Sequence, residues 1–165
     1  MSENVIKFGT DGWRGVISDD FTFENVRVVA QAIADYLNKA RPGQVIVSYD
    51  TRFLSGRYAG TVSEVLAGNG IRVILTDRPG TTPSLSLAIK QRGLAGGVMI
   101  TASHNPSRYN GIKFKAYYAG PAESGVTKEI ESLLYQSPVK KKDLKDAVKE
   151  GSIFLENILP AYERY

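Results

Sequence analysis

A strand-like apolar run leads directly into a polar segment that holds a serine, the only histidine of the chain and an asparagine. The apolar run covers residues 97–100, and Ser103, His104 and Asn105 follow it. In open α/β sheets, ligands bind beyond the carboxyl ends of the strands. We therefore expect these three side chains to lie at a ligand site. Two plainer interpretations stay open, because serine and asparagine are common turn residues and a lone histidine is often a structural hydrogen-bonding group.

A second segment, residues 8–15, combines three glycines with small hydroxyl and acidic residues and one arginine. Glycines let the backbone come close to a ligand, and backbone N–H groups in such a loop can cradle a phosphate while an arginine clamps it with two hydrogen bonds. The segment matches neither the Walker A loop nor the G-x-G-x-x-G fingerprint. It is therefore expected to be a loop close to an anionic ligand, with Arg14 as the clamp.

The elements that must position these two segments are short β-branched runs alternating with longer amphipathic stretches. Strands are predicted at residues 45–49, 71–75 and 97–100, and helices at 26–37, 55–67 and 84–91. Ser55 is the predicted N-cap of the second helix. This alternation predicts βαβ units and a parallel sheet.

A fourth strand, residues 112–115, is expected to follow a tight Asn110–Gly111 turn. It should run antiparallel to the strand before it, because a parallel partner needs a crossover of about a dozen residues or more. A last helix is predicted at 124–135. The expected fold class is α/β, a three-layer α/β/α domain with a mixed, mostly parallel sheet of about four strands.

Beyond residue 136 the chain changes in character. Residues 140–146, KKKDLKD, are typical of a solvated helix face or a linker. A basic nucleic-acid patch is disfavoured because Asp143 and Asp146 interrupt the lysines and no aromatic residues interleave for base stacking. A short strand is expected at 153–155. The expected division is therefore a domain at 1–136 and a charged helix or linker at 137–165 that leads to a second domain absent from this chain.

The composition is that of one globular domain: 165 residues, 42% hydrophobic and 23% charged. The chain has no cysteine, which excludes disulfides, thiolate metal sites and a cysteine nucleophile. It shows neither a signal peptide nor an apolar run long enough to cross a bilayer, so a cytoplasmic location without a membrane partner is expected. The net charge of +4 is ordinary for this length, or it suits a small anionic substrate.

Three stretches of the chain together resemble the α-D-phosphohexomutases, the phosphoglucomutase and phosphomannomutase family. They are FGTDGWRG at 8–15, TASHNP at 101–106 and YNGIKFK at 109–115. The order of strands and helices between them also resembles the first domain of that family, and the resemblance covers residues 5 to 135. It implies a phosphoserine enzyme that interconverts hexose 1-phosphate and hexose 6-phosphate through a bisphosphosugar intermediate. Glucose phosphates are the first expectation, mannose phosphates the second and phosphoglucosamine the third.

The resemblance also implies a role for each matching residue. The loop serine carries the phosphoryl group, the histidine contacts it or the substrate, the lysine assists at the transferring group, and the arginine lies near the phosphoserine. The asparagine holds the loop, and a threonine and an aspartate shape the site. The implied catalytic residues are Ser103, His104, Lys113 and Arg14, and the implied substrate- and phosphate-binding residues are Thr10, Asp11 and Asn105. Plainer alternatives are a solvated strand position for Lys113, an ion pair for Arg14 and a structural role for His104.

The family also uses groups that this chain does not contain. One Mg²⁺ per active site is implied, bound by the phosphate on Ser103 and by three carboxylates of a D-x-D-x-D-R loop in the second domain, and this chain has no D-x-D-x-D. Glucose 1,6-bisphosphate is implied as activator and intermediate. The expected partners are a phosphosugar substrate and the remaining domains of the same enzyme, without nucleic acid. The chain alone is therefore expected to be inactive.

The main alternative is a non-enzymatic module that binds phosphate or a phosphosugar, and phosphorylation of Ser103 would distinguish the two. A serine hydrolase is disfavoured because the chain has no G-x-S-x-G and its only histidine directly follows Ser103, where activation of the hydroxyl would be strained.

Overall fold

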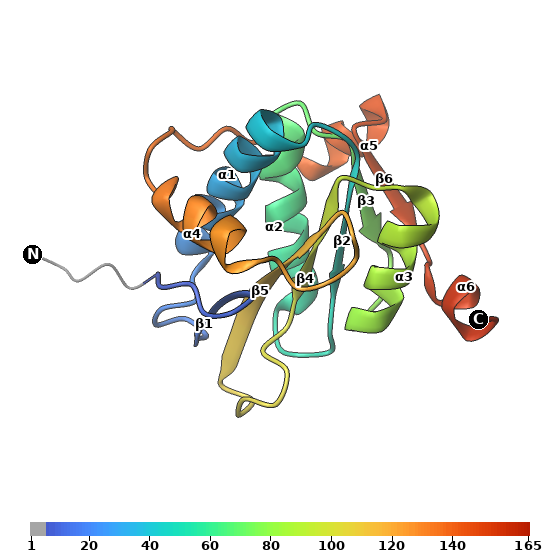
Figure 1. Ribbon diagram of the computed structural model, residues 1–165, viewed down its shortest axis with the longest axis horizontal. Helices are drawn as coiled ribbons and strands as arrows, with labels where there is room; N and C mark the ends of the chain where they lie inside the picture. Colours follow the sequence, from blue (N-terminus) through green and yellow to red (C-terminus); the bar gives the residue numbers. More distant parts are fainter. Residues whose placement is uncertain (1–5) are drawn as a thin grey trace, which may run out of the picture.

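The computed structural model describes residues 6–165, and one six-stranded sheet forms the centre of the described part (Figure 1). The strand order is β1-β5-β4-β2-β3-β6. The strands are β1 (Gly12–Val16), β2 (Val45–Tyr49), β3 (Val73–Thr76), β4 (Gly96–Ile100), β5 (Tyr109–Ala116) and β6 (Ile153–Glu156). The helices are α1 (Phe23–Ala40), α2 (Ser55–Gly68), α3 (Thr82–Arg92), α4 (Ser124–Ser132), α5 (Leu144–Glu150) and α6 (Leu159–Glu163).

The sheet is mixed and mostly parallel, as predicted. β4, β2, β3 and β6 pair in parallel, while β5 pairs antiparallel with both β4 and β1. The predicted size of about four strands is too small, because both edge strands add to it. β6 had been expected only as an isolated short strand in the tail, and β1 lies in the segment predicted to be a loop.

Helices cover both faces of the sheet, which confirms the α/β/α layers. α2 packs on β2, β3 and β4 and carries α1 and α5 beside it, and α4 packs on α1. On the other face, α3 packs on β2 and β4 and contacts α6 (Figure 1). A core of buried aliphatic and aromatic side chains fills each interface, because burying the apolar face of each element is what stabilises such layers.

The start of α2 differs from the prediction in one respect that bears on the site. Leu54, in the left-handed conformation at φ 62°, is the residue before the helix, and Ser55 is the first helical residue. The Ser55 hydroxyl does not cap the helix. It donates a hydrogen bond to the Asp50 carboxylate at 2.7 Å, so this serine ties the helix start to the end of β2.

The predicted Asn110–Gly111 turn is wrong, because both residues lie inside β5. Asn110 is fully buried, and its side-chain amide donates to the Ser55 hydroxyl at 2.9 Å. Gly111 lies where a Cβ atom would come within 2.6 Å of the Thr101 carbonyl oxygen. A buried hydrogen bond thus accounts for the asparagine and close packing for the glycine. The chain reverses earlier, between Thr101 and Arg108.

The segment beyond residue 136 packs on the domain. Its lysine-rich part runs along α1 and α2: the Lys140 N–H donates to the Gln31 side chain at 3.0 Å, and the Lys142 N–H donates to the Glu64 carbonyl at 2.9 Å. Asp143 caps α5, and β6 then joins the edge of the sheet beside β3. Among residues 6–165, no helix combines the length and the apolar character needed to span a membrane.

Candidate active site

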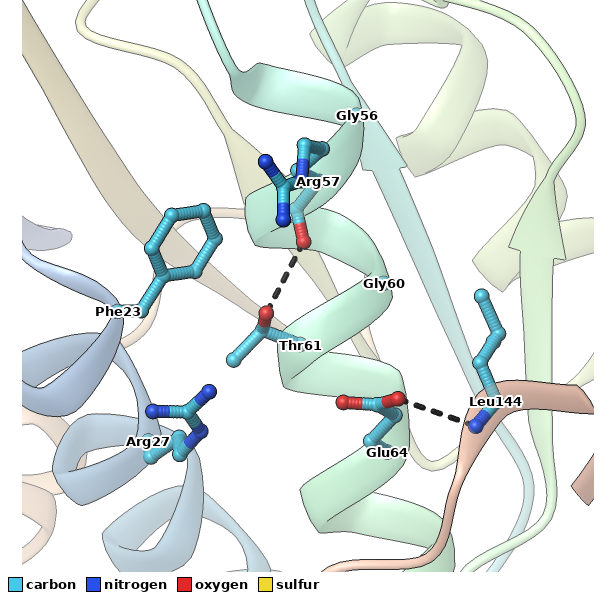
Figure 2. A pocket seen from close by; sticks show the side chains of 8 residues that line it. All are labelled: Phe23, Arg27, Gly56, Arg57, Gly60, Thr61, Glu64 and Leu144. Carbon is cyan, nitrogen blue, oxygen red and sulfur yellow. Dashed lines mark hydrogen bonds between the residues drawn. The ribbon is translucent and has the colours of Figure 1, made fainter.

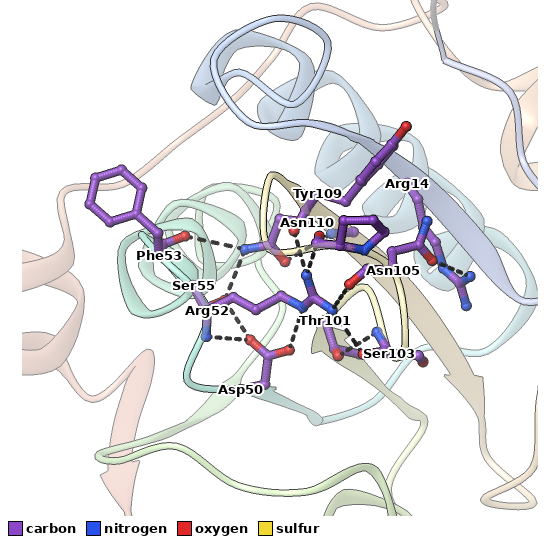
Figure 3. A network of polar contacts seen from close by, with 12 residues as sticks. Arg14, Asp50, Arg52, Phe53, Ser55, Thr101, Ser103, Asn105, Tyr109 and Asn110 are labelled. Carbon is purple, nitrogen blue, oxygen red and sulfur yellow. Dashed lines mark hydrogen bonds and ion pairs between the residues drawn. The ribbon is translucent and has the colours of Figure 1, made fainter.

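The polar segment after β4 lies at the same edge of the sheet as the segment after β2. β2 and β4 are parallel neighbours, so their carboxyl ends lie side by side. The Asp50 N–H donates to the Ile100 carbonyl at 3.0 Å, which joins the two segments where they leave the sheet. Figure 3 shows the side chains that meet beyond this edge. The expectation that the loop after β4 lies at a strand-end site is consistent with this placement.

Ser103 occupies a constrained position in the loop. Its backbone is left-handed at φ 51°, a conformation that a non-glycine residue adopts at a cost in free energy unless its surroundings hold it. Its N–H donates to the Thr101 hydroxyl at 3.0 Å, and its own hydroxyl oxygen lies 2.7 Å from the Lys113 ammonium. The serine side chain is exposed, whereas only 13% of the Lys113 side chain is exposed. The site thus presents an accessible hydroxyl with a largely buried cation directly on it.

Asp11 links this pair to a second lysine. Its carboxylate lies 3.6 Å from the Lys113 ammonium and 3.8 Å from that of Lys115. Lys113 and Lys115 alternate along β5 and therefore share one face of the strand. Asp11 compensates the charge of both lysines and restrains Lys113 beside Ser103. Lys115 lies against Asp11 and makes no hydrogen bond to the serine hydroxyl, which Lys113 contacts.

Burial lowers the pKa of Lys115 below the ordinary lysine value; attraction to Asp11 opposes this shift and repulsion from Lys113 adds to it. Since the folded pKa lies below the unfolded one, the folded chain binds fewer protons between the two values. This lysine therefore makes the chain more stable as the pH rises through that window.

We expect Asp11→Asn to lower the pKa of Lys115 further, because it removes the group that favours the charged ammonium. A ¹³Cε NMR titration of the lysines in the wild-type and Asp11→Asn chains measures this. Asp19→Asn, which removes an exposed carboxylate outside the site, is the control and should leave the titration unchanged. An unchanged Lys115 midpoint in Asp11→Asn would contradict the coupling between these residues.

The glycine-rich segment is partly a strand, which corrects the prediction of a loop. Gly12 pairs with Lys113 at the start of β1, and a Cβ atom on Gly12 would overlap the Ile112 carbonyl. The close approach that this glycine permits is therefore to the backbone of β5 and not to a ligand. Trp13 is buried against Phe21 with ring centroids 4.8 Å apart, and it anchors the strand in the core.

Arg14 follows this buried tryptophan and faces the other way, toward solvent. Its guanidinium donates to the Asn105 side-chain oxygen at 2.9 Å (Figure 3), so β1 and the serine loop are joined at the site. Thr10 and Arg14 line an open hollow of about 370 Å³ beside Asp11. The Thr10 side chain is exposed and makes no hydrogen bond among residues 6–165.

His104 lies next to Ser103 in the loop but makes no side-chain hydrogen bond within the described part of the chain. Its side chain is exposed. The structure therefore brings Ser103, Lys113 and Asp11 into one group and Arg14 and Asn105 into a second, and His104 and Thr10 contact neither group through polar bonds.

Sequence reasoning missed Arg52, which has the most contacts in the site. Its guanidinium donates to the carbonyl oxygens of Ser103, Asn105, Pro106 and Tyr109 at 2.6–3.0 Å (Figure 3). Its Nε lies 3.4 Å from the Asp50 carboxylate. Asp50 and Arg52 directly follow a predicted strand, so the strand-end rule that selected Ser103 would have selected them too.

A separate hollow of about 440 Å³ lies between α1, α2 and the start of α5 (Figure 2). The Arg27 and Arg57 side chains extend into it. Its other polar groups are engaged locally: the Glu64 carboxylate accepts from the Leu144 N–H at 3.0 Å, and the Thr61 hydroxyl donates to the Arg57 carbonyl at 3.1 Å. None of the predicted site residues lines it, so we place the candidate active site at the sheet edge.

The residues present do not fit a complete Mg²⁺ site. Residues 6–165 contain no group of three or more side chains of the kind that would hold a metal ion. Asp11 is the carboxylate nearest to the serine–lysine pair, and it already faces two ammonium groups. A divalent cation needs several free oxygen ligands, and the neighbouring ammonium groups would repel it. This chain by itself therefore offers a hydroxyl and cations, which suit a phosphate and not a metal.

The fold and the site together define an α/β/α domain that presents a serine hydroxyl and a lysine at one edge of a mixed sheet. Residues 5–138 match the family model described as phosphoglucomutase/phosphomannomutase, alpha/beta/alpha domain I. The chain belongs to this family, the α-D-phosphohexomutases, which confirms the resemblance seen in the sequence.

Individual relatives agree with this assignment. A phosphoglucomutase of Staphylococcus saprophyticus is 37% identical over 162 residues, which cover 92% of this chain and 29% of that protein. One of Staphylococcus aureus is 42% identical over 118 residues, or 67% of this chain and 21% of that protein. The chain thus spans less than a third of the length of these curated relatives.

Solved structures show the same fold. A crystal structure of a phosphomannomutase homologue from Thermus thermophilus superimposes with a TM-score of 0.84 at 41% identity, covering 95% of this chain and 34% of that one. A phosphoglucomutase/phosphomannomutase family protein from Burkholderia thailandensis has a TM-score of 0.79 at 19% identity, covering 98% and 35%, and supports the fold alone.

Proposed function

We propose that this chain is the phosphoserine-bearing domain of an enzyme that interconverts hexose 1-phosphate and hexose 6-phosphate, with Ser103 as the phosphate carrier. The observation that carries the proposal is the 2.7 Å contact between the exposed Ser103 hydroxyl and the Lys113 ammonium. Glucose phosphates are the first substrates to test and mannose phosphates the second, in keeping with the names of the relatives.

The proposed reaction is a pair of phosphoryl transfers. The phosphorus–oxygen bond to Ser103 breaks while a hydroxyl of the phosphosugar attacks phosphorus and loses its proton, and the serine oxygen is left as a hydroxyl. The resulting bisphosphosugar turns around, and its other phosphate returns to Ser103 by the reverse step. Phosphoryl transfer depends mainly on positioning and on neutralising charge. Lys113 supplies both, because its ammonium lies on the oxygen whose bond to phosphorus forms and breaks.

Arg14 and His104 complete the proposed site on the side open to solvent. Arg14 contacts Asn105 through one guanidinium nitrogen, which leaves further N–H groups for a phosphate oxygen. His104 is exposed next to the carrier serine and is free to meet the phosphoryl group or the sugar. Thr10 and Asp11 shape the neighbouring hollow, and Asn105 holds the loop to Arg14.

We further propose that turnover needs domains outside this chain. Residues 137–165 would lead to the next domain, which would supply the carboxylates for one Mg²⁺ beside the phosphate on Ser103. Bound there, Mg²⁺ would neutralise charge on the phosphoryl group. Glucose 1,6-bisphosphate would be the activator that loads the serine. The 165-residue chain alone is then expected to show no mutase activity.

The test uses the full-length protein that carries this domain. Incubation with glucose 1,6-bisphosphate should add about 80 Da to its mass, the size of one phosphoryl group. The loaded protein should convert glucose 1-phosphate to glucose 6-phosphate in a coupled assay, with mannose 1-phosphate assayed in parallel. A protein that binds these sugars but never carries phosphate on Ser103 would instead be the alternative, a non-enzymatic phosphosugar-binding module.

A further inference from the structure

We infer that Arg52 is a positioning residue that holds the serine loop in its reactive shape from behind, without contacting the phosphate. The inference rests on the proposed function and adds to it a residue that neither the motifs nor the family match assigns. Arg52 reaches the loop from the end of β2, and its side chain is only 14% exposed.

All four N–H groups on the two terminal nitrogens of Arg52 donate hydrogen bonds to the loop. A guanidinium has five N–H donors in a fixed plane. One terminal nitrogen donates to Pro106 and Tyr109 and the other to Ser103 and Asn105, while Nε faces the Asp50 carboxylate. With the four terminal donors bonded to the loop and Nε turned toward the Asp50 carboxylate, no donor is left for a phosphate oxygen. Arg52 therefore differs from Arg14, which has donors to spare.

A network of polar contacts fixes Arg52 in turn. The Asp50 carboxylate accepts hydrogen bonds from the backbone N–H of Arg52 at 2.9 Å and from the Ser55 hydroxyl at 2.7 Å. The Ser55 hydroxyl also accepts from the buried Asn110 side chain at 2.9 Å. Asp50 and Ser55 belong to the β2–α2 connection and Asn110 belongs to β5. The guanidinium is thus anchored on the rigid sheet and helix, and the loop is anchored on the guanidinium.

The contacts explain how a strained serine stays in place. Ser103 is left-handed, and its own carbonyl is one of the four that Arg52 binds. The other three carbonyls, from Asn105 to Tyr109, hold the remainder of the loop around the same planar group. Releasing them would let the Ser103 hydroxyl move away from Lys113. A displacement of about 1 Å at reacting atoms can lower a rate about 10²-fold.

The kinetic test compares Arg52→Gln and Arg52→Lys with the wild type in the full-length protein. Both variants should lose about 10²-fold in kcat. KM for the phosphosugar should change by less than about threefold, because Arg52 does not touch substrate. The kcat of Arg52→Lys should be as low as that of Arg52→Gln, because an ammonium has only three donors and lacks the planar geometry of a guanidinium. Arg57→Gln is the matched control, because Arg57 is on α2, lies over the Phe23 ring of α1 and is outside the site.

A second measurement does not depend on activity. In the 165-residue chain, two backbone hydrogen bonds lie within the loop. The Asn105 backbone N–H donates to the Ala102 carbonyl, and the Tyr109 backbone N–H donates to the Pro106 carbonyl. Their hydrogen exchange should be at least about tenfold faster in Arg52→Gln. Exchange at core amides of β2 should stay unchanged, as should both regions in Arg57→Gln.

The outcomes separate the two proposals. If wild-type protein takes no phosphate on Ser103, the proposed function fails, and the exchange result still shows whether Arg52 holds the loop. If the wild type is active and both Arg52 variants keep kcat within about threefold of it, the inference about Arg52 is wrong. It is also wrong if amide exchange in the loop of Arg52→Gln is unchanged. Equally faster exchange in loop and core would also overturn it, because Arg52 would then stabilise the whole domain and not the loop.

Discussion

Replacing Ser103 with alanine is expected to abolish mutase activity in the full-length protein, with a loss of about 10⁴-fold or more, as when the nucleophile of a covalent mechanism is removed. The phosphate adduct from glucose 1,6-bisphosphate should disappear with it. The fold should not change, because the hydroxyl is exposed and its hydrogen bond to Lys113 lies at the surface. Intact-mass spectrometry and the coupled assay measure the two effects on the same sample.

Ser107→Ala is the matched control for this experiment. Ser107 lies in the same loop and is also exposed, and its hydroxyl makes no hydrogen bond among residues 6–165. It should keep both the adduct and the activity. An adduct that survives in Ser103→Ala and is lost in Ser107→Ala would move the phosphate carrier to the other serine and contradict the proposed site.

Lys113→Met is expected to lower kcat by about 10³-fold, the size of effect seen when one preorganised donor to a developing charge is removed. Methionine keeps most of the length and apolar stem of lysine, so the largely buried side chain is replaced and only the ammonium is lost. Without it, nothing at 2.7 Å stabilises the serine oxygen when its bond to phosphorus breaks. Steady-state kinetics with glucose 1-phosphate, under saturating bisphosphate, measure this effect.

Lys90→Met controls for the loss of one positive charge, since Lys90 is exposed on α3 and outside the site. It should leave kcat within about twofold of the wild type, as expected for a surface charge far from the chemistry. If Lys113→Met were equally mild, Lys113 would be only a strand residue that happens to reach the serine, the plainer interpretation that the sequence left open.

The central strands were predictable from the sequence, and the edges of the sheet were not. Residues 45–49 and 97–100 are mostly apolar, as is typical of strands buried on both faces, and their parallel pairing followed from the helices between them. β1 was not predicted as a strand because two of its five residues are glycines, which have low strand propensity. It forms because Trp13 is buried and Gly12 can lie against β5, and both are long-range effects.

The candidate site was predictable where residue type carries the chemistry. Ser103 and Lys113 were chosen from their motifs, and they lie in direct contact. The position of Arg52 just after a strand could have marked it as a candidate, but the sequence could not show what it binds. It acts on backbone carbonyls, which every residue has, so no pattern of side chains marks its partners. Those partners are 51 to 57 residues away in the sequence. Only the fold brings β2 and β4 together and makes the contact visible.

The position of β6 sets the length of the shortest fragment of this domain in which β3 keeps both of its neighbouring strands. A protein cut at residue 138, where the family model ends, would lose β6 and leave β3 with a full row of unpaired backbone groups. The four residues of β3 are all buried and have no charge or proline to discourage pairing with another chain. Such a fragment would be prone to edge-to-edge aggregation. For crystallisation or NMR, the fragment should therefore extend at least through Glu156.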